Sequence, residues 1–248
     1  MRRELAGWVD EEVGSADDIL IIDESSFLKG GDKSVGVARQ YLGCVGKVAN
    51  GQVAVYLAYA SRHGHTLLDT RLSLPEEWCN DPPRLAAAGV PKDVVFRTKP
   101  ELALALVCQV RAHLRHHWVT FDEAYGRKAA FLSGLEELGE QYLGEVPKDT
   151  RGWLQRPAVE IPAAGRKGRP ASKPRVAAGE PAPQTVAAIT ATLPASAWTR
   201  HQVRDGSKGE HFAEFARVRF VVERDHLPGP ELWLLLERSC DQQSPLKF

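Results

Sequence analysis

The stretch Ile19-Leu20-Ile21-Ile22-Asp23-Glu24-Ser25 determines the fold prediction, because an apolar run leads directly into two carboxylates. Consecutive apolar residues of high β-propensity, bounded by polar ones, are typical of a strand buried on both faces. Open α/β sheets bind ligands at the carboxyl ends of their strands. Asp23 is therefore a candidate catalytic or metal-binding carboxylate. The plainer alternative is that it is the polar residue that ends a core strand.

A second stretch, Trp118-Val119-Thr120-Phe121-Asp122-Glu123, repeats the pattern of a short apolar strand followed by Asp-Glu. Carboxylates at the ends of neighbouring strands can share divalent cations, and Mg²⁺ and Mn²⁺ prefer oxygen ligands. The alternative is that Asp122 only begins the helical turn after it, a common role for aspartate. Taken together, the two Asp-Glu pairs favour a site for Mg²⁺ or Mn²⁺ at Asp23 and Asp122.

The segments around these stretches predict the element order βββ-α-β-α-β. Apolar alternation and turn residues, including Gly30-Gly31 and Asn50-Gly51, predict three strands that follow one another as an antiparallel meander. Helical spacing and strand propensity predict the remaining elements, which are expected at 99–114, 118–121, 128–138 and 142–146. This is the order of a ribonuclease H-like mixed α/β sheet, in which the first and fourth strands lie side by side.

The composition changes after this core. Pro, Ala and Gly dominate residues 156–183, which also carry Arg166, Lys167, Arg169, Lys173 and Arg175. Such a composition predicts a flexible linker or loop rather than a folded element. The segments that follow read as strands. We therefore expect a short leader at 1–18, a core at 19–150, a linker at 156–183 and a β-rich insertion segment at 184–248.

Charge and composition restrict the partners and the compartment. Lys plus Arg equals Asp plus Glu at 32 each, so a surface that binds nucleic acid must concentrate its cations locally. Candidate phosphate contacts are the cations near the proposed acidic site, for which a charged hairpin rim is an equally good explanation: Lys29, Lys33, Arg39 and Lys47. The basic residues of the linker are a further candidate for non-specific DNA binding, for which a merely soluble linker is at least as good an explanation.

Other classes of site find less support. The four cysteines follow no zinc-binding or CxxC spacing, which favours reduced thiols in a cytoplasmic protein. His63, His65, His116 and His117 lack partners at zinc-like spacing. Ser25 and Ser26 do not lie in a nucleophile elbow. No apolar run approaches the roughly 20 residues that a membrane helix needs, so no membrane association is expected.

Three segments resemble the catalytic core of bacterial insertion-sequence DDE transposases. They are the segments at 21–31 and 34–43 and Val119-Thr120-Phe121-Asp122-Glu123-Ala124-Tyr125-Gly126. The resemblance covers roughly residues 17–150 and implies a branch with a β-rich insertion between the second and third acidic residues. It implies that Asp23 and Asp122 are the first two metal-binding acids. Glu24, Glu123 and Tyr125 are motif neighbours rather than assigned ligands.

The resemblance also implies metal-dependent cleavage of DNA and transfer of a freed 3′-hydroxyl to target DNA. Its third acid, a glutamate on a helix, has no match here, because Glu214, Glu223, Glu231 and Glu237 lie in strand-like or turn contexts. We therefore expect a truncated, weakly active or inactive fragment. The alternatives are a nuclease that uses one of these glutamates, and a non-catalytic DNA-binding remnant that associates with the full-length transposase.

Overall fold

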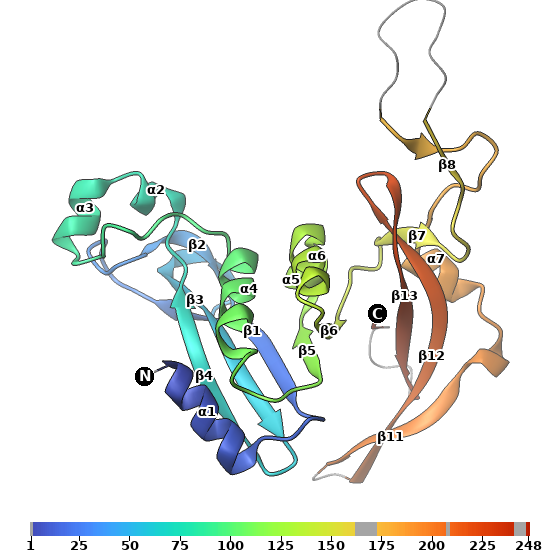
Figure 1. The fold of residues 1–248 in the computed structure, drawn as a ribbon, viewed down its shortest axis with the longest axis horizontal. Helices are drawn as coiled ribbons and strands as arrows, with labels where there is room; N and C mark the ends of the chain where they lie inside the picture. Colours follow the sequence, from blue (N-terminus) through green and yellow to red (C-terminus); the bar gives the residue numbers. More distant parts are fainter. Residues whose placement is uncertain (1, 162–172, 207–208, 241–246) are drawn as a thin grey trace, which may run out of the picture. The chain divides into compact units, whose positions relative to one another are not determined.

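The computed structural model describes residues 2–161, 173–206, 209–240 and 247–248. The chain forms two compact units, Met1–Gly144 and Glu145–Phe248. Each unit has its own sheet and its own buried core (Figure 1). The division falls six residues before the end of the core expected at 19–150, and the first unit also includes the expected leader. Part of the predicted linker, with Arg166, Lys167 and Arg169, lies outside the described residues.

The first unit is built on a mixed sheet of six strands in the order β2-β3-β1-β5-β6, with β4 paired to the second half of β3. Strand β1 runs antiparallel to β3 and parallel to β5, and β5 runs parallel to β6. The prediction of a mixed α/β sheet is thereby confirmed. The strands are β1 (Ile19–Leu28), β2 (Ala38–Leu42), β3 (Lys47–Ser61), β4 (Gly64–Leu72), β5 (Trp118–Phe121) and β6 (Gln141–Gly144).

The predicted turn at Asn50-Gly51 is wrong, because both residues lie inside the long strand β3. The chain reverses earlier, between β2 and β3, where Gly46 adopts a positive φ of 65°. Asn50 instead ties down a neighbouring loop, since its side-chain amide donates to the backbone oxygens of Lys29 and Gly31 at 2.9 and 2.7 Å. Consequently β3, rather than β2, lies next to β1, and the antiparallel meander consists of β1, β3 and β4.

Three helices pack on one face of this sheet, namely α1 (Arg2–Val13), α4 (Lys99–Val110) and α6 (Ala129–Glu137). Strand β1 buries Leu20 and Ile22 on that face. Helix α4 begins with a capping box, in which Thr98 and Glu101 each accept a backbone N–H from the other residue. Three shorter helices are α2 (Glu76–Cys79), α3 (Pro82–Ala87) and α5 (Glu123–Gly126).

The opposite face of the sheet is largely exposed. Register and alternation place Ile21, Asp23 and Tyr56 on this face of β1 and β3, with Trp118 on the same face of β5. Ile21 is 37% exposed and Trp118 is 38% exposed, although both are large apolar residues. Asp23 therefore projects from an uncovered apolar surface of the first unit and not into its core.

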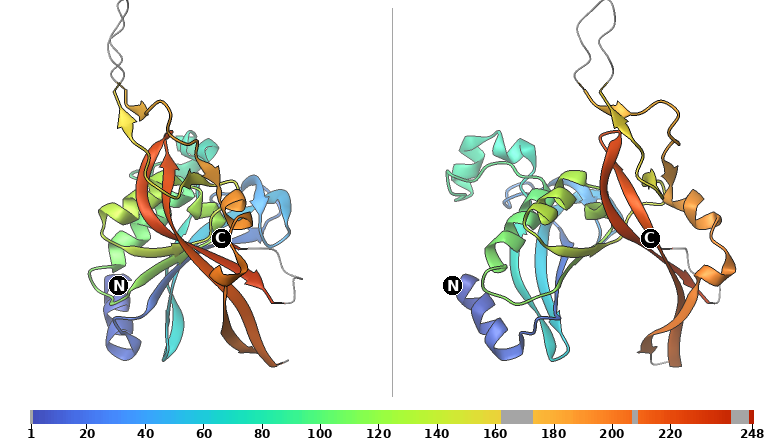
Figure 2. Two further views of the ribbon diagram at one scale, coloured as in Figure 1. Left: turned by 90° about the vertical axis from the view of Figure 1, so that its right-hand side faces the viewer. Right: turned by 45° about the vertical axis from the view of Figure 1, so that its right-hand side comes forward.

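The second unit is dominated by two long antiparallel strands, β12 (Gly209–Arg224) and β13 (Leu227–Ser239), which appear as curved ribbons in both views of Figure 2. Its core contains Phe220, Leu234 and Leu236 together with Val186 and Ile189 of a helix, α7 (Val186–Ala191), that the sequence analysis did not predict. The other strands are β7 (Arg151–Trp153), β8 (Val159–Glu160), β9 (Arg175–Val176), β10 (Gln184–Thr185) and β11 (Thr199–Gly206).

Strands β8 and β9 pair within the segment predicted as a linker. Arg175 also forms an ion pair with Glu160 at 3.0 Å. The prediction that this segment contains no folded element therefore does not hold for its two ends.

Candidate metal centre

The parallel pairing of β1 and β5 brings Asp23 and Asp122 together. Ile22 is registered opposite Phe121, and each aspartate is the next residue of its chain segment. Neighbouring strands lie about 4.8 Å apart, so the two residues lie beside each other where β5 ends. Both are exposed. The lateral pairing expected from the two Asp-Glu pairs is thus present in the backbone of the first unit. The expectation that Asp23 ends its strand is wrong, because β1 stays paired to β3 as far as Leu28 and Asp23 lies within it.

Each aspartate uses one carboxylate oxygen to fix its own orientation. Oδ1 of Asp23 accepts the backbone N–H of Glu24 at 2.7 Å, and Oδ1 of Asp122 accepts that of Ala124 at 3.0 Å. Asp122 is therefore the N-cap of α5, so it also has the role that was considered as the alternative, that of beginning the helical turn after it. In each residue Oδ2 has no hydrogen-bond partner in the described part of the chain, which leaves one oxygen of each carboxylate for a cation.

The chemistry of these donors fits a hard divalent cation. One or two carboxylates are the usual protein contribution to a Mg²⁺ site, with water and phosphate oxygens as further ligands. Within the described residues, no group of three or more His, Cys, Asp or Glu side chains is arranged to hold a metal ion. The first unit therefore supplies a pair of ligands rather than a closed cage.

The neighbouring glutamates are engaged elsewhere. Glu24 lies on the opposite face of β1 from Asp23, and its Oε2 accepts from Nζ of Lys99 at 2.5 Å. Glu123 forms an ion pair with Arg127 one turn later. Their interpretation as motif neighbours rather than metal ligands agrees with these contacts.

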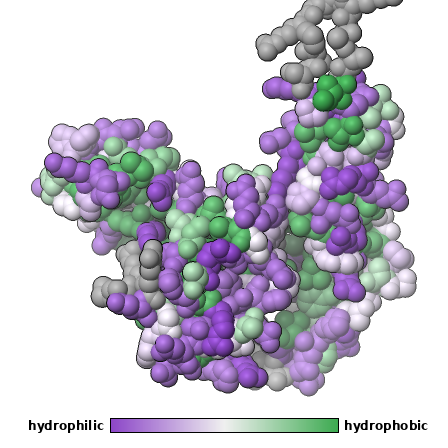
Figure 3. Space-filling view, in the orientation of Figure 1, coloured by the Kyte–Doolittle hydropathy of each residue, from purple (hydrophilic) through white to green (hydrophobic). Residues whose placement is uncertain are grey.

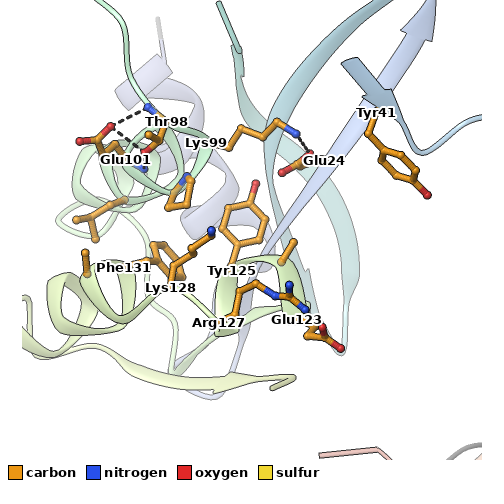
Figure 4. A pocket seen from close by; sticks show the side chains of 14 residues that line it. Glu24, Tyr41, Thr98, Lys99, Glu101, Glu123, Tyr125, Arg127, Lys128 and Phe131 are labelled. Carbon is orange, nitrogen blue, oxygen red and sulfur yellow. Dashed lines mark hydrogen bonds and ion pairs between the residues drawn. The ribbon is translucent and has the colours of Figure 1, made fainter. Parts of the chain in front are cut away.

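A cavity of about 990 Å³ adjoins this edge, and its wall includes Glu24 and the segment that follows Asp122 (Figure 4). Helices α4 and α6 are in contact, and Figure 3 shows hydrophobic side chains at the surface of the first unit in the region where they lie. Tyr125 forms one wall and is only 1% exposed. Burial, reinforced by the carboxylates of Glu24 and Asp122, raises the pKa of Tyr125, so its hydroxyl is protonated at neutral pH.

From the sequence, Tyr125 is expected only as a motif neighbour, and neither Lys99 nor the cavity is expected. Lys99 approaches β1 from α4, which is 75 residues away along the chain. No local pattern reports such a contact. For Tyr125 the available signal was its position three residues after Asp122, in a segment of mostly small and polar residues.

The four cations proposed as DNA contacts are all exposed: Lys29, Lys33, Arg39 and Lys47. Arg39 is registered opposite Asn50, and alternation along β3 from Asn50 to Tyr56 places it on the same face as Asp23. Lys47 has the opposite parity and lies on the other face. The sheet therefore brings Arg39, but not Lys47, to the face of the candidate centre.

Two of the four histidines that were considered for a zinc site, and found to lack suitable partners, have other contacts. Arg62 donates to Nε2 of His63 at 3.0 Å, and Nε2 of His116 lies 2.8 Å from Oε2 of Glu140. The described residues contain no cluster in which these histidines could share a metal ion. The described part of the chain also contains no helix that is long and apolar enough to span a membrane.

Comparison with known proteins identifies relatives of this chain. A family profile described as DDE superfamily endonuclease matches residues 1–210. The curated protein "Probable transposase for insertion sequence element IS701" from Microchaete diplosiphon is 37% identical over 128 residues, which are 50% of this chain and 30% of that protein. The matched region thus covers less than a third of the relative's length.

Proposed function

Since this chain belongs to the family of DDE superfamily endonucleases, we propose that it forms the catalytic-core part of an insertion-sequence DNA transposase. The observation that supports this most directly is the lateral pairing of Asp23 and Asp122 by strands β1 and β5. The strand order around them agrees with a ribonuclease H-like core in which the second unit is the β-rich insertion. We expect this protein to act on DNA in the cytoplasm.

Enzymes of this superfamily use divalent metal ions, and we propose Mg²⁺ or Mn²⁺ held by the free Oδ2 atoms of Asp23 and Asp122. Such ions polarise a phosphodiester and lower the pKa of bound water. The residues of this chain hold and orient the two carboxylates, through the backbone N–H groups of Glu24 and Ala124. The expected reaction is strand cleavage at the element ends, followed by attack of the freed 3′-hydroxyl on target DNA.

The DNA backbone is proposed to cross the exposed face of the first unit. Arg39 shares that face with Asp23 and is the strongest candidate for a phosphate contact. Lys29 and Lys33 lie exposed in the loop between β1 and β2 and could extend the path. Lys47 is retained as a candidate only at the rim, because it projects from the other face.

Three of the four glutamates considered as a local third acid are occupied within the second unit. Glu214 pairs with Arg238 at 2.7 Å, and Glu231 pairs with Arg219 at 2.7 Å. Glu223 lies 3.4 Å from Arg151. These contacts weaken the alternative of a nuclease that completes its site with one of them. We therefore expect the described residues to bind metal ions weakly and to cut DNA poorly by themselves.

Manganese binding tests the site without requiring turnover. We expect Mn²⁺ to bind to the wild-type chain, as followed by electron paramagnetic resonance, and to bind at least about tenfold more weakly to Asp23→Asn and Asp122→Asn, since each loses a charged oxygen ligand. Asp93→Asn, an exposed loop aspartate, is the matched control and should bind Mn²⁺ like the wild type. Equal Mn²⁺ binding by all four proteins would refute the metal centre.

Plasmid nicking in Mn²⁺ then measures activity. Little or no nicking by the wild-type chain is the expected result, because two carboxylates hold a pair of metal ions poorly. Robust nicking that Asp23→Asn abolishes would show that the chain completes its own site. A chain that shifts DNA of the element ends in gels, binds Mn²⁺ and does not nick would fit the second candidate, a DNA-binding remnant that associates with full-length transposase.

A further inference from the structure

We infer that the cavity beside the candidate metal centre is a binding site for one nucleotide of a DNA strand, with its phosphate held by Tyr125 and Lys128. The assignment of this nucleotide as a neighbour of the cleaved phosphate rests on the proposed function. The existence of a nucleotide-phosphate site does not. Nothing in the chemistry proposed above uses either residue.

The Tyr125 hydroxyl is a buried donor that lacks an acceptor. It has no hydrogen-bond partner within the described part of the chain, although its residue is 1% exposed. Leaving a buried polar group unsatisfied costs about 1–3 kcal/mol, so such a group requires an explanation. Figure 4 shows the hydroxyl directed into the cavity, near Glu24. Burial and then the Glu24 carboxylate raise the pKa of this hydroxyl, but that carboxylate already accepts from Lys99 and makes no hydrogen bond of ordinary geometry with Tyr125.

The charges that line the cavity leave one cation unpaired. Glu24 is paired with Lys99, and Glu123 with Arg127. Glu101 accepts the N–H and the hydroxyl of Thr98 in the capping box of α4. Among the described residues Lys128 has no ion-pair partner, and in Figure 4 its chain extends toward Tyr125. A neutral donor and an unpaired ammonium on one wall together favour an anion rich in acceptor oxygens.

The remaining walls favour an anion that carries an organic group. Pro100, Leu104 and Phe131 form an apolar surface in the cavity. The volume of about 990 Å³ is at the upper end of the range for small-molecule pockets and far exceeds the needs of a lone phosphate. A nucleotide combines both features, because its phosphate accepts hydrogen bonds while its sugar and base cover apolar surface.

The position of the cavity connects it to the metal centre. Glu24 directly follows Asp23, and the segment from Glu123 to Lys128 directly follows Asp122. Glu24 lies on the opposite face of β1 from Asp23, so the cavity and the metal centre meet only at the end of β5, where the segment after Asp122 forms part of the cavity wall. A DNA strand that passes from the exposed face over this end of β5 would carry its next nucleotide toward the cavity. The proposed site therefore continues the path of the substrate around the end of β5.

Binding of the dinucleotide pTpT, measured by isothermal titration calorimetry in EDTA, tests the inference in the absence of metal ions and turnover. We expect Tyr125→Phe and Lys128→Ala each to bind pTpT about tenfold more weakly than the wild type, the loss expected for one hydrogen bond to a charged group. Lys92 is an exposed lysine that does not line the cavity, so Lys92→Ala is the matched control and should bind like the wild type.

Three results would overturn the inference. The first is wild-type affinity of Tyr125→Phe for pTpT, and the second is no binding of pTpT to the wild type at millimolar concentration. The third is equally tight binding of inorganic phosphate, which would remove the nucleotide from the assignment. Since these titrations contain no metal ion, a failure of the Mn²⁺ or nicking experiments leaves their outcome unaffected, and the two proposals can fail separately.

Discussion

Replacing Gly51 with alanine is expected to lower the free energy of unfolding of the first unit by about 3 kcal/mol, at the upper end of the cost of overpacking a core. A Cβ at this position would lie 2.4 Å from the backbone oxygen of Phe27 and 2.5 Å from Cδ1 of Leu42. The leucine side chain can move, but the carbonyl belongs to the paired strand β1. Accommodation therefore requires β1 and β3 to separate locally.

Urea unfolding monitored by tryptophan fluorescence measures this effect. Gly43→Ala is the matched control, because a Cβ there meets no atom within 4 Å, and it should unfold like the wild type. The double variant Gly51→Ala/Leu42→Ala should not recover the lost stability, since the contact with the carbonyl remains. A Gly51→Ala protein as stable as Gly43→Ala would mean that β1 and β3 are not in the register described here.

Tyr59→Phe is expected to cost the first unit about 2 kcal/mol, the range for a buried hydrogen bond to a charged group. The Tyr59 hydroxyl donates to Oδ2 of Asp18 at 2.5 Å, and the backbone N–H of Ser15 donates to the same oxygen at 2.6 Å. Tyr59 is fully buried and Asp18 is 4% exposed. Without the hydroxyl, the carboxylate of Asp18 keeps fewer donors in a buried position.

Tyr125→Phe provides the opposite case in the same unit. Its hydroxyl makes no hydrogen bond in the described structure, so its removal should leave the unfolding midpoint in urea unchanged or slightly higher. Both substitutions remove one hydroxyl oxygen, but only Tyr59→Phe also removes a hydrogen bond. The difference in stability between the two variants therefore measures the contribution of that hydrogen bond. Similar destabilisation by both substitutions would contradict the partnered and unpartnered states assigned to the two hydroxyls.

The contribution of Tyr59 also has a defined pH dependence. Burial, followed by the hydrogen bond to Asp18, raises the pKa of Tyr59 above its ordinary value of 10.0. A group whose pKa is higher in the folded state stabilises the fold fully below its unfolded pKa and loses that contribution as the pH rises. The stability difference between wild type and Tyr59→Phe should therefore be constant near neutral pH and should shrink above pH 10.0.

Local sequence patterns located much of the first unit. The apolar run before Asp23 and the short strand before Asp122 form β1 and β5, and helical spacing located α4 and α6. These predictions succeeded because they depend on residues close in sequence, whose burial has a regular period. The Asn50-Gly51 turn was wrong because the same dipeptide also suits a strand position where the backbone of a neighbour leaves no room for a side chain. Only the pairing of β1 with β3 distinguishes the two cases.

The sequence by itself determined the two candidate carboxylates, Asp23 and Asp122, because a carboxylate that directly follows an apolar run is recognisable locally. Only the tertiary structure decided that Arg39 shares the face of Asp23, that Glu24 turns away to Lys99, and that the Tyr125 hydroxyl lies buried without a partner. The physical reason is that strand register and side-chain burial arise from contacts between segments distant in sequence. Such contacts depend on two segments at once, so the residues of one segment do not predict them.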